Sequence, residues 1–238
     1  MFRTRHGAPP RALAPLALPL ILLALLAGGC GGGSPSGNGV ASKSPDQILA
    51  ATKSAASAAT SVHVTGTLAS HGTPITIDMS LAAGRGGKGK LSENGLSFEL
   101  IVLDETIYIK GSPSFYSHFG GSAAAQLFQG KWLKAPAGQG ELASLGSLAN
   151  LGKILDQVLA STGSLTKGST TTLAGQPVVE LTDATKSGSL YVAITGEPYP
   201  VQIVKHGSET GRVSFSEWNK PVALRAPANA IDIGALGK

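Results

Sequence analysis

The sequence predicts an α+β domain with a strongly curved antiparallel sheet of about 10 or 11 strands and helices on its concave face. Two observations lead to this prediction. Apolar and polar residues alternate with the two-residue period of strands in the blocks 61–110 and 164–218. The segment between them, 112–161, repeats leucines at helical spacing instead. Strand runs interrupted by one helical block favour α+β, and a sheet of about ten strands has to curl.

The chain begins with the pattern of a secretory signal. Arg3, Arg5 and Arg11 precede an apolar run at 13–27, and two glycines then lead to Cys30. Basic residues, an apolar core and small residues in this order are typical of an export signal, which is removed from the mature protein. We therefore expect residues 1–29 to be a signal peptide and exclude them from fold reasoning.

Cys30 is the only cysteine of the chain. The segment LAGGC that ends at Cys30 resembles the bacterial lipobox, in which the cysteine is lipidated and a peptidase cuts just before it. A single cysteine cannot form an internal disulfide, and a free thiol is a liability on an exported protein. We expect lipidation of Cys30, which would anchor the protein to the outer face of the cytoplasmic membrane or to the cell envelope. An ordinary signal peptide with a chance cysteine is the alternative.

A Gly/Ser-rich segment follows the cysteine. We expect residues 30–44 to form the lipidated cysteine and a flexible tether, and 45–238 to form one domain. The signal carries three of the 19 Lys and Arg residues and none of the 14 acidic residues, so removing it lowers the net charge from +5 to +2. The remaining sequence shows no Lys/Arg stripe interleaved with aromatics, so we expect no nucleic-acid partner.

The elements of the domain follow in order. Ser44, Pro45 and Asp46 are typical of a helix start, and small apolar residues continue the helix to about residue 60. Alternation then predicts strands at 62–68, 75–79, 88–93, 96–103 and 106–110. Aromatic residues gather around 115–128, a short strand is possible at 131–134, and the leucine stripe runs to 159. The second block predicts strands at 164–172, 176–182, 189–195, 200–206 and 212–218, separated by glycines.

Four segments resemble the LppX/LprG-type lipoproteins of actinobacteria, which have a LolA-like fold. They are the lipobox and tether leading to the strand SVHV at 61–64, the hairpin FELIVLDETIYIK at 98–110, GKWL at 130–133, and the run from LAGQ at 173–176 to FSEW at 215–218. The hairpin turn has Asp104-Glu105 where the family pattern has Asp-Gly. The resemblance implies a half-barrel that carries acyl chains of lipids or lipoglycans across the envelope.

No catalytic or metal-binding motif is present in the sequence. It contains no Gly-x-Ser-x-Gly, no His-Glu-x-x-His and no phosphate-binding Gly-x-x-x-x-Gly-Lys-Ser/Thr. His63, His71, His118 and His206 are dispersed without the spacing of metal ligands. We therefore expect no enzymatic activity, no cofactor and no metal.

The surplus of apolar residues is the remaining functional signal, because an apolar cavity tolerates varied acyl chains. We expect candidate lining residues from the helical block and from two strands: Leu100, Val102, Ile107, Ile109, Phe115, Phe119, Phe128, Leu148, Leu151, Leu155 and Val158. Alternatively, these residues simply fill the core. The expected function is binding and transfer of lipid or lipoglycan by a monomer, with a possible transporter or membrane-protein partner. A non-enzymatic sensor or scaffold with the same fold is the rival hypothesis.

Overall fold

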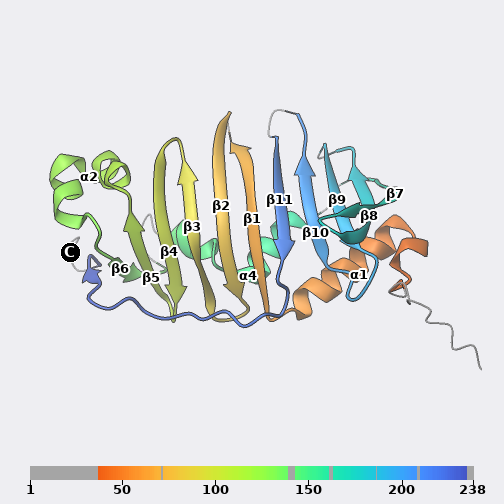
Figure 1. Cartoon of the computed structure of the whole chain (residues 1–238), viewed down its shortest axis with the longest axis horizontal. Helices are drawn as coiled ribbons and strands as arrows, with labels where there is room; N and C mark the ends of the chain where they lie inside the picture. The colour runs from red at the N-terminus through yellow and green to blue at the C-terminus, as the bar shows by residue number, and fades with distance from the viewer. Residues whose placement is uncertain are drawn as a thin grey trace, which may run out of the picture. The chain divides into compact units, whose positions relative to one another are not determined.

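The computed structural model contains a mostly antiparallel sheet, and it describes residues 37–70, 72–138, 143–160, 163–185, 187–207 and 210–234 (Figure 1). The sheet has twelve strands in the order β12-β6-β5-β4-β3-β2-β1-β11-β10-β9-β8-β7. Every neighbouring pair of described strands is antiparallel except β12 with β6, which is parallel. The strands are β1 (Ser61–Ser70), β2 (Thr73–Ala82), β3 (Gly86–Glu93), β4 (Leu96–Leu103), β5 (Thr106–Gly111), β6 (Leu133–Pro136), β7 (Leu165–Leu173), β8 (Gln176–Asp183), β9 (Gly188–Ala193), β10 (Pro200–Lys205), β11 (Gly211–Ser216) and β12 (Ile231–Asp232).

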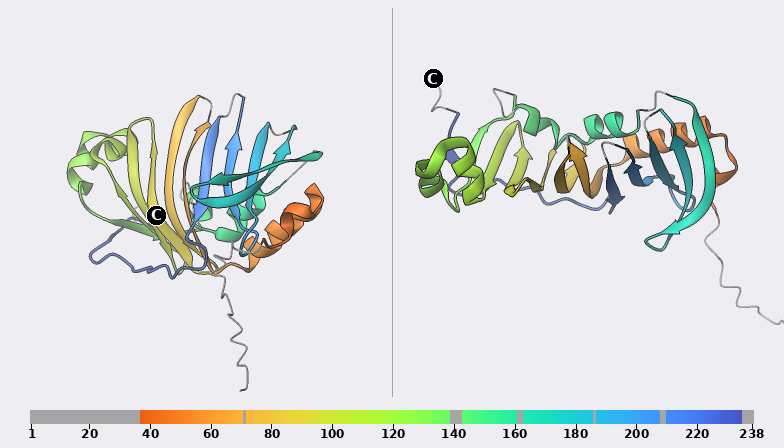
Figure 2. Two further views of the ribbon diagram at one scale, coloured as in Figure 1. Left: turned by 45° about the vertical axis from the view of Figure 1, so that its right-hand side comes forward. Right: turned by 90° about the horizontal axis from the view of Figure 1, so that it is seen from above.

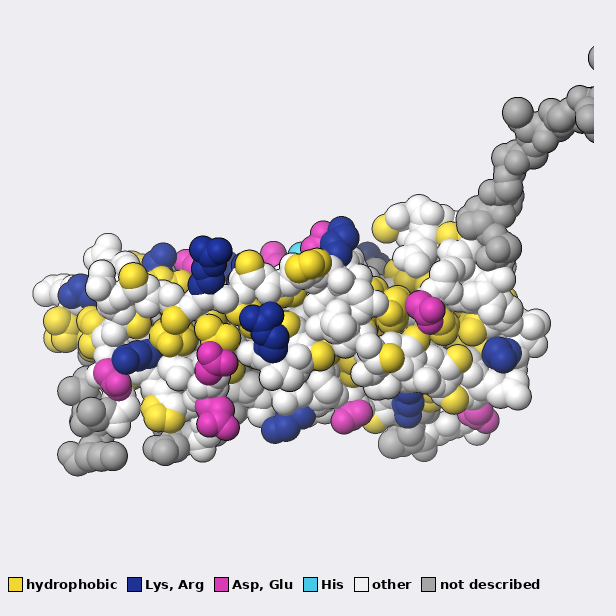
Figure 3. Space-filling view, turned by 90° about the horizontal axis from the view of Figure 1, so that it is seen from below, with side chains coloured by type: hydrophobic (Ala, Val, Ile, Leu, Met, Phe, Trp, Pro, Cys, Tyr) yellow, Lys and Arg dark blue, Asp and Glu magenta, His cyan; other side chains and the backbone are white. Residues whose placement is uncertain are grey.

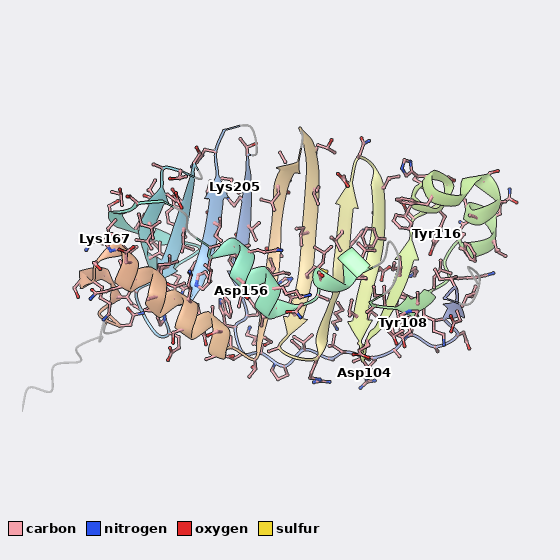
Figure 4. The ribbon with its side chains drawn as sticks, turned by 180° about the vertical axis from the view of Figure 1, so that it is seen from behind. Asp104, Tyr108, Tyr116, Asp156, Lys167 and Lys205 are labelled. Carbon is pink, nitrogen blue, oxygen red and sulfur yellow. The ribbon has the colours of Figure 1, made fainter. Side chains whose placement is uncertain are left out.

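The helices lie on one face and at one end of this sheet. A 3-10 turn, η1 (Val40–Ser42), precedes α1 (Pro45–Ala58), and α3 (Ala143–Ser147) and α4 (Leu151–Val158) follow in the middle of the chain. Figure 4 shows α1 and α4 in front of the same sheet face, whereas α2 (Pro113–Phe128) stands at the end formed by β5 and β6. No helix of the described segments has the length and apolar character needed to cross a membrane.

The α+β class is confirmed, but the predicted strong curvature is wrong. The described sheet has twelve strands rather than 10 or 11, and it is twisted rather than strongly curled (Figure 2). The additional strands are short, since β12 has two residues and β6 has four. The right-handed twist of each strand rotates it relative to its neighbour, and this lets a wide sheet stay open without closing towards a barrel. The described helices therefore cover a face of an open sheet and do not fill a half-barrel.

The start of α1 follows directly from its sequence. The Ser44 hydroxyl accepts a hydrogen bond from the Gln47 N–H, and the Gln47 side chain accepts one from the Ser44 N–H. This reciprocal pair is a capping box, and Pro45 occupies the first helical position, where its missing N–H costs nothing. The cap places Ile48 and Thr52 on the buried side of the helix.

The apolar core is divided into two clusters. The larger one joins β1–β5 and β11 to α4 and includes Leu81, Leu100, Ile107 and Leu155. The smaller one lies under η1 and α1, where Ile48 packs with side chains of β8 and β9. The partly buried residues Leu49 and Leu190 contact both clusters.

Tyr116 fixes the start of α2 to the sheet. Its hydroxyl accepts a hydrogen bond from the Gly111 N–H at 2.8 Å and donates one to the Lys131 carbonyl at 3.2 Å. The side chain is only 4% exposed. Burial raises the pKa of Tyr116 above its ordinary value. The phenol therefore ties β5, α2 and the segment before β6 together in its neutral form.

We expect Tyr116→Phe to lower the free energy of unfolding by about 1–3 kcal/mol, because it leaves the Gly111 N–H without its partner. Urea denaturation at neutral pH measures this loss. Below pH 10 the wild-type stabilisation is fully present. As the pH rises further, the unfolded chain ionises its tyrosine first, so stability falls towards the raised folded pKa. The difference between wild type and variant should therefore shrink at high pH, and a constant difference would contradict the proposed role of the neutral phenol.

Candidate functional site

A pocket of about 570 Å³ lies between the sheet and the helices α1 and α4 and is partly open to solvent. Figure 4 shows this region around the labels Lys205 and Asp156, where the two helices pass over the β8–β11 half of the sheet. The lining is mainly apolar and comes from six strands, two helices and the segment after α4: Leu49, Leu68, Gln157, Val158, Leu159, Ala160, Leu165, Leu181, Asp183, Gly188, Ser189, Leu190, Ile203, Val204, Lys205 and Val213.

The inner part of the pocket floor is a row of aliphatic side chains. Leu181 of β8 pairs with Leu190 of β9, Leu190 with Ile203 of β10, and Ile203 with Val213 of β11. Residues directly opposite each other in antiparallel neighbours project on the same face of the sheet. The four side chains therefore form a continuous apolar strip across four strands.

The outer part of the floor is the next row on the same face, two residues along each strand. It runs from Asp183 through Gly188, Lys205 and Gly211 to Leu68. This row contains one acidic and one basic residue, and glycines flank the basic one on both sides. The floor thus changes from wholly apolar in the inner row to partly charged in the outer row.

Helix α4 and Leu49 of α1 form the opposite wall. The eight-residue α4 contributes its last turn and the residues directly after it, of which Leu159 is buried. Val158 is 36% exposed although it is a large apolar side chain. The pocket therefore lies between the larger and the smaller core cluster. At this place α1 and α4 leave part of the sheet uncovered.

The acidic residue of the pocket is held in a fixed position. Asp183 is 8% exposed, and its Oδ1 accepts a hydrogen bond from the Thr185 N–H at 2.9 Å. Across the described residues, no group of three or more His, Cys, Asp or Glu side chains is arranged to hold a metal ion. The arrangement offers a hydrophobic surface with charged groups at one margin and no assembled catalytic group.

The structure places one sequence-predicted candidate, Val158, on this pocket. Six others are buried in the larger core cluster: Leu100, Val102, Ile107, Ile109, Leu151 and Leu155. Leu148 and Phe115 pack against that cluster as partly buried residues. Phe119 is 68% exposed on α2, and Phe128 contacts the Tyr116 ring from the end of the same helix. The pocket therefore lies in the β8–β11 half of the sheet, away from the β4–β5 hairpin.

Sequence reasoning missed most of the pocket residues. The alternation at 189–195 and 200–206 predicts one apolar face for each strand, but it does not show what covers that face. Coverage depends on the pairing of β1 with β11, which are far apart in the chain. The sequence alone also does not show that Lys205 lies between Gly188 and Gly211. These glycines become its neighbours only through the pairing of β10 with β9 and β11.

Part of the expected tether is attached to the domain. Gly37 forms an isolated bridge with Thr195, and the Asn38 side-chain amide donates to the carbonyls of Ala193 and Gly196 at 3.0 Å each. Val40 is 2% exposed within the smaller cluster. Residues 37–40 are therefore attached to the β9 region, whereas Cys30 and residues 31–36 lie outside the described residues.

The fold is that of the LppX/LprG type. The chain is similar to LprF from Mycobacterium bovis, with 18% identity and a TM-score of 0.56 over 83% of this chain and 100% of LprF. It is also similar to the lipoprotein LppX from Mycobacterium tuberculosis, with 18% identity and a TM-score of 0.51 over 76% of this chain and 100% of LppX. The sequence matches no protein-family model and no curated protein.

Proposed function

We propose that this protein is an exported, lipid-anchored lipoprotein that binds an acyl chain in the pocket over β8–β11 and passes lipid on within the cell envelope. The apolar floor is the observation that carries the proposal. Leu181, Leu190, Ile203 and Val213 present a continuous aliphatic strip, and transfer of a hydrocarbon chain from water to such a surface is favourable without directional contacts. The fold that the chain shares with LprF and LppX supports the same function.

The size of the pocket suits one chain. A methylene group is about as large as a water molecule, which takes about 30 Å³ of the liquid, so about 570 Å³ holds roughly 20 such groups. One fatty acyl chain therefore fits, while the several chains of a large lipoglycan do not fit together. The wider proposal of lipoglycan transport would require such a ligand to insert a single chain.

The protein acts without catalysis in this proposal. The sequence contains no nucleophile elbow, zinc-binding helix motif or phosphate-binding loop. In this proposal Cys30 is the anchor and residues 1–29 are the signal peptide.

Lipid uptake tests the proposal. We expect the full chain carrying Cys30→Ser, purified without detergent, to retain bound lipid in native mass spectrometry and to take up a fluorescent fatty acid at micromolar or lower concentration. The serine variant keeps the domain intact while removing its own acyl chains, which would otherwise compete for the pocket. Only apo protein in the spectrum, together with no saturable uptake of the probe, would exclude the lipid-binding function.

One observation favours the second candidate, a non-enzymatic scaffold that binds a protein partner. Helix α2 contains no Lys, Arg, Asp or Glu, and it exposes Phe119 and Leu127 to 68% and 56%. Exposed apolar side chains on an uncharged helix are typical of interaction surfaces. Figure 3 shows apolar side chains on one face of the molecule between scattered charges. A protein that remains apo in the uptake experiment would favour this candidate.

A further inference from the structure

We infer that helix α2 is a membrane-contact surface that enters the headgroup region of a bilayer containing anionic lipid. The inference goes beyond the proposed acyl-chain binding, because α2 lies at the β5–β6 end of the sheet and lines no part of the pocket. Figure 1 shows α2 at the opposite end of the sheet from α1.

The apolar surface of α2 is supported by a cluster of aromatic rings. The centroid of the Phe119 ring lies 4.8 Å from that of Phe115, which lies 5.1 Å from that of Phe98 on β4. Phe128, at the end of α2, lies 5.8 Å from the Tyr116 ring. Phe98 and Phe115 pack against the larger core cluster, whereas the Phe119 side chain is 68% exposed. The folded domain therefore holds Phe119 at its surface through contacts that lead back to the core.

The helix can enter a lipid surface without burying a charge. It contains no Lys, Arg, Asp or Glu in its 16 residues, and Leu127 is 56% exposed near its end. Removing such apolar side chains from water is favourable and needs no directional contact. Interfacial helices bury their apolar side chains at the boundary between headgroups and acyl chains in this way.

The charges beside α2 favour an anionic bilayer. The helix packs on β4 and β5, whose single charged residues, Glu99 and Lys110, pair with each other at 3.3 Å. Lys131 comes shortly after the helix, is exposed, and forms no ion pair with any residue that the structure describes. Trp132 follows it, and tryptophan is a residue type that gathers at the membrane–water interface. An uncharged apolar helix followed by an unpaired cation thus complements the apolar interior and the anionic headgroups of a bilayer.

The position of α2 gives the contact a role beside the proposed anchor. Gly37 is bridged to Thr195 just after β9, and seven strand spacings separate β9 from β5, about 34 Å measured across the strands. An anchor at Cys30 and a contact at α2 would therefore hold the sheet at two separate places and orient it along the membrane. Alone, two apolar side chains and one lysine bind a bilayer only weakly and reversibly, so the contact depends on the high local concentration that an anchor provides.

Sedimentation with vesicles tests the contact. The protein is the chain from residue 30 onward with Cys30→Ser, secreted behind a signal that is cut independently of lipidation, so that neither acyl chains nor the apolar run 13–27 contributes. We expect it to bind vesicles of phosphatidylcholine and phosphatidylglycerol in equal parts, and to bind pure phosphatidylcholine vesicles more weakly. Phe119→Ser combined with Leu127→Ser should lower the binding about 10- to 100-fold, because both side chains leave water in the bound state.

A lysine variant tests the charge. Lys131→Gln should lower the binding to the mixed vesicles about fivefold, as one lysine near an anionic surface predicts, and leave the binding to pure phosphatidylcholine unchanged. Lys90→Gln removes the same charge from an exposed position on β3 and should change neither.

The double variant also separates this inference from the proposed function. Both of its positions are exposed, so it should keep the urea midpoint of the parent chain and take up the fluorescent fatty acid equally well. Undiminished vesicle binding by the double variant would overturn the inference and leave the acyl-chain pocket intact. No binding of the parent chain to either kind of vesicle would also overturn it and would leave α2 to the protein-partner candidate. Vesicle binding through α2 without any uptake of the fatty acid would overturn the proposed function alone.

Discussion

Replacing Ile203 by glutamate is expected to weaken the binding of an uncharged single-chain lipid at least about 100-fold. Ile203 lies in the middle of the apolar strip, between Leu190 and Val213. An acyl chain bound over these aliphatic side chains would remove water from the new carboxylate. Burying a charged group without a partner costs several kcal/mol. In the empty pocket, which is partly open, the carboxylate stays hydrated, so the fold should persist.

Oleyl alcohol is the appropriate ligand for this measurement. Its headgroup is uncharged, so repulsion between the new carboxylate and an anionic headgroup cannot cause the loss. A contact between the new carboxylate and Lys205, two residues along β10, involves no group of this uncharged ligand. Calorimetric titration of the Cys30→Ser chain with and without Ile203→Glu gives the ratio of the dissociation constants.

Ile77→Glu provides the matched control. Ile77 is also half-buried and lies on the same sheet face, in the row that continues from Val213 through Gly66, but it does not line the pocket. It packs against the larger core cluster, so the control carries a comparable or larger cost in stability. If Ile77→Glu weakens lipid binding as strongly as Ile203→Glu, the effect is general destabilisation and the pocket assignment is wrong.

Local sequence signals predicted the elements of the fold where the physical cause was itself local. The helix after Ser44 is confirmed because its cap, its Pro45 and its buried small residues lie within one short segment. The hairpin of β4 and β5 is confirmed for the same reason. Its turn residues Asp104 and Glu105 both have positive φ, at 49° and 60°, a conformation that the family's Asp-Gly pattern accommodates more easily.

The helix α2 and the shape of the sheet could not be predicted from such signals. Gly121 has a φ of 71° inside α2, so the segment is kinked and its sequence lacks a continuous apolar stripe. Curvature depends on the twist between strands and on where the helices pack. Both are properties of the assembled layers, and strand periodicity contains no information on either.

The candidate site shows the same limit. The hypothesis of an apolar pocket came from a surplus of apolar residues, and the residues named for it included Leu100, on a nearly all-apolar strand, and Ile107 on the return strand. A run of apolar residues does not distinguish a cavity wall from a filled core, and these two side chains lie in the core. Pocket residues such as Val158 and Leu190 lie where the helices stop covering the sheet. Which part of a sheet the helices cover is a property of the tertiary structure.

Replacing Cys30 by serine is expected to release the protein from membranes. Each buried lipid methylene contributes about 0.8 kcal/mol, and two or more chains hold a protein stably where one binds reversibly. Without its acyl chains the protein should therefore move from the membrane fraction to the soluble fraction. Because the signal is cut only before a lipidated cysteine, the Cys30→Ser chain carries, in place of residues 1–29, a signal that is cut independently of lipidation. Fractionation of cells expressing the wild-type chain or this variant measures the change, and intact-mass analysis of the wild type should show the added acyl mass. Retention of the serine variant in the membrane fraction would contradict an anchor at Cys30.

The contacts that attach residues 37–40 to the domain limit the reach of an anchor at Cys30. If the contacts of Asn38 and Val40 persist, residues 31–36 alone separate Cys30 from the attached Gly37. Seven residue steps of extended chain span at most about 25 Å, so the β9 region cannot move farther than this from the anchored cysteine. The pocket is lined by β9 through Gly188, Ser189 and Leu190. Lipid exchange with the protein's own membrane therefore requires no long excursion, whereas transfer across a wider gap requires a second carrier or release of the attached segment.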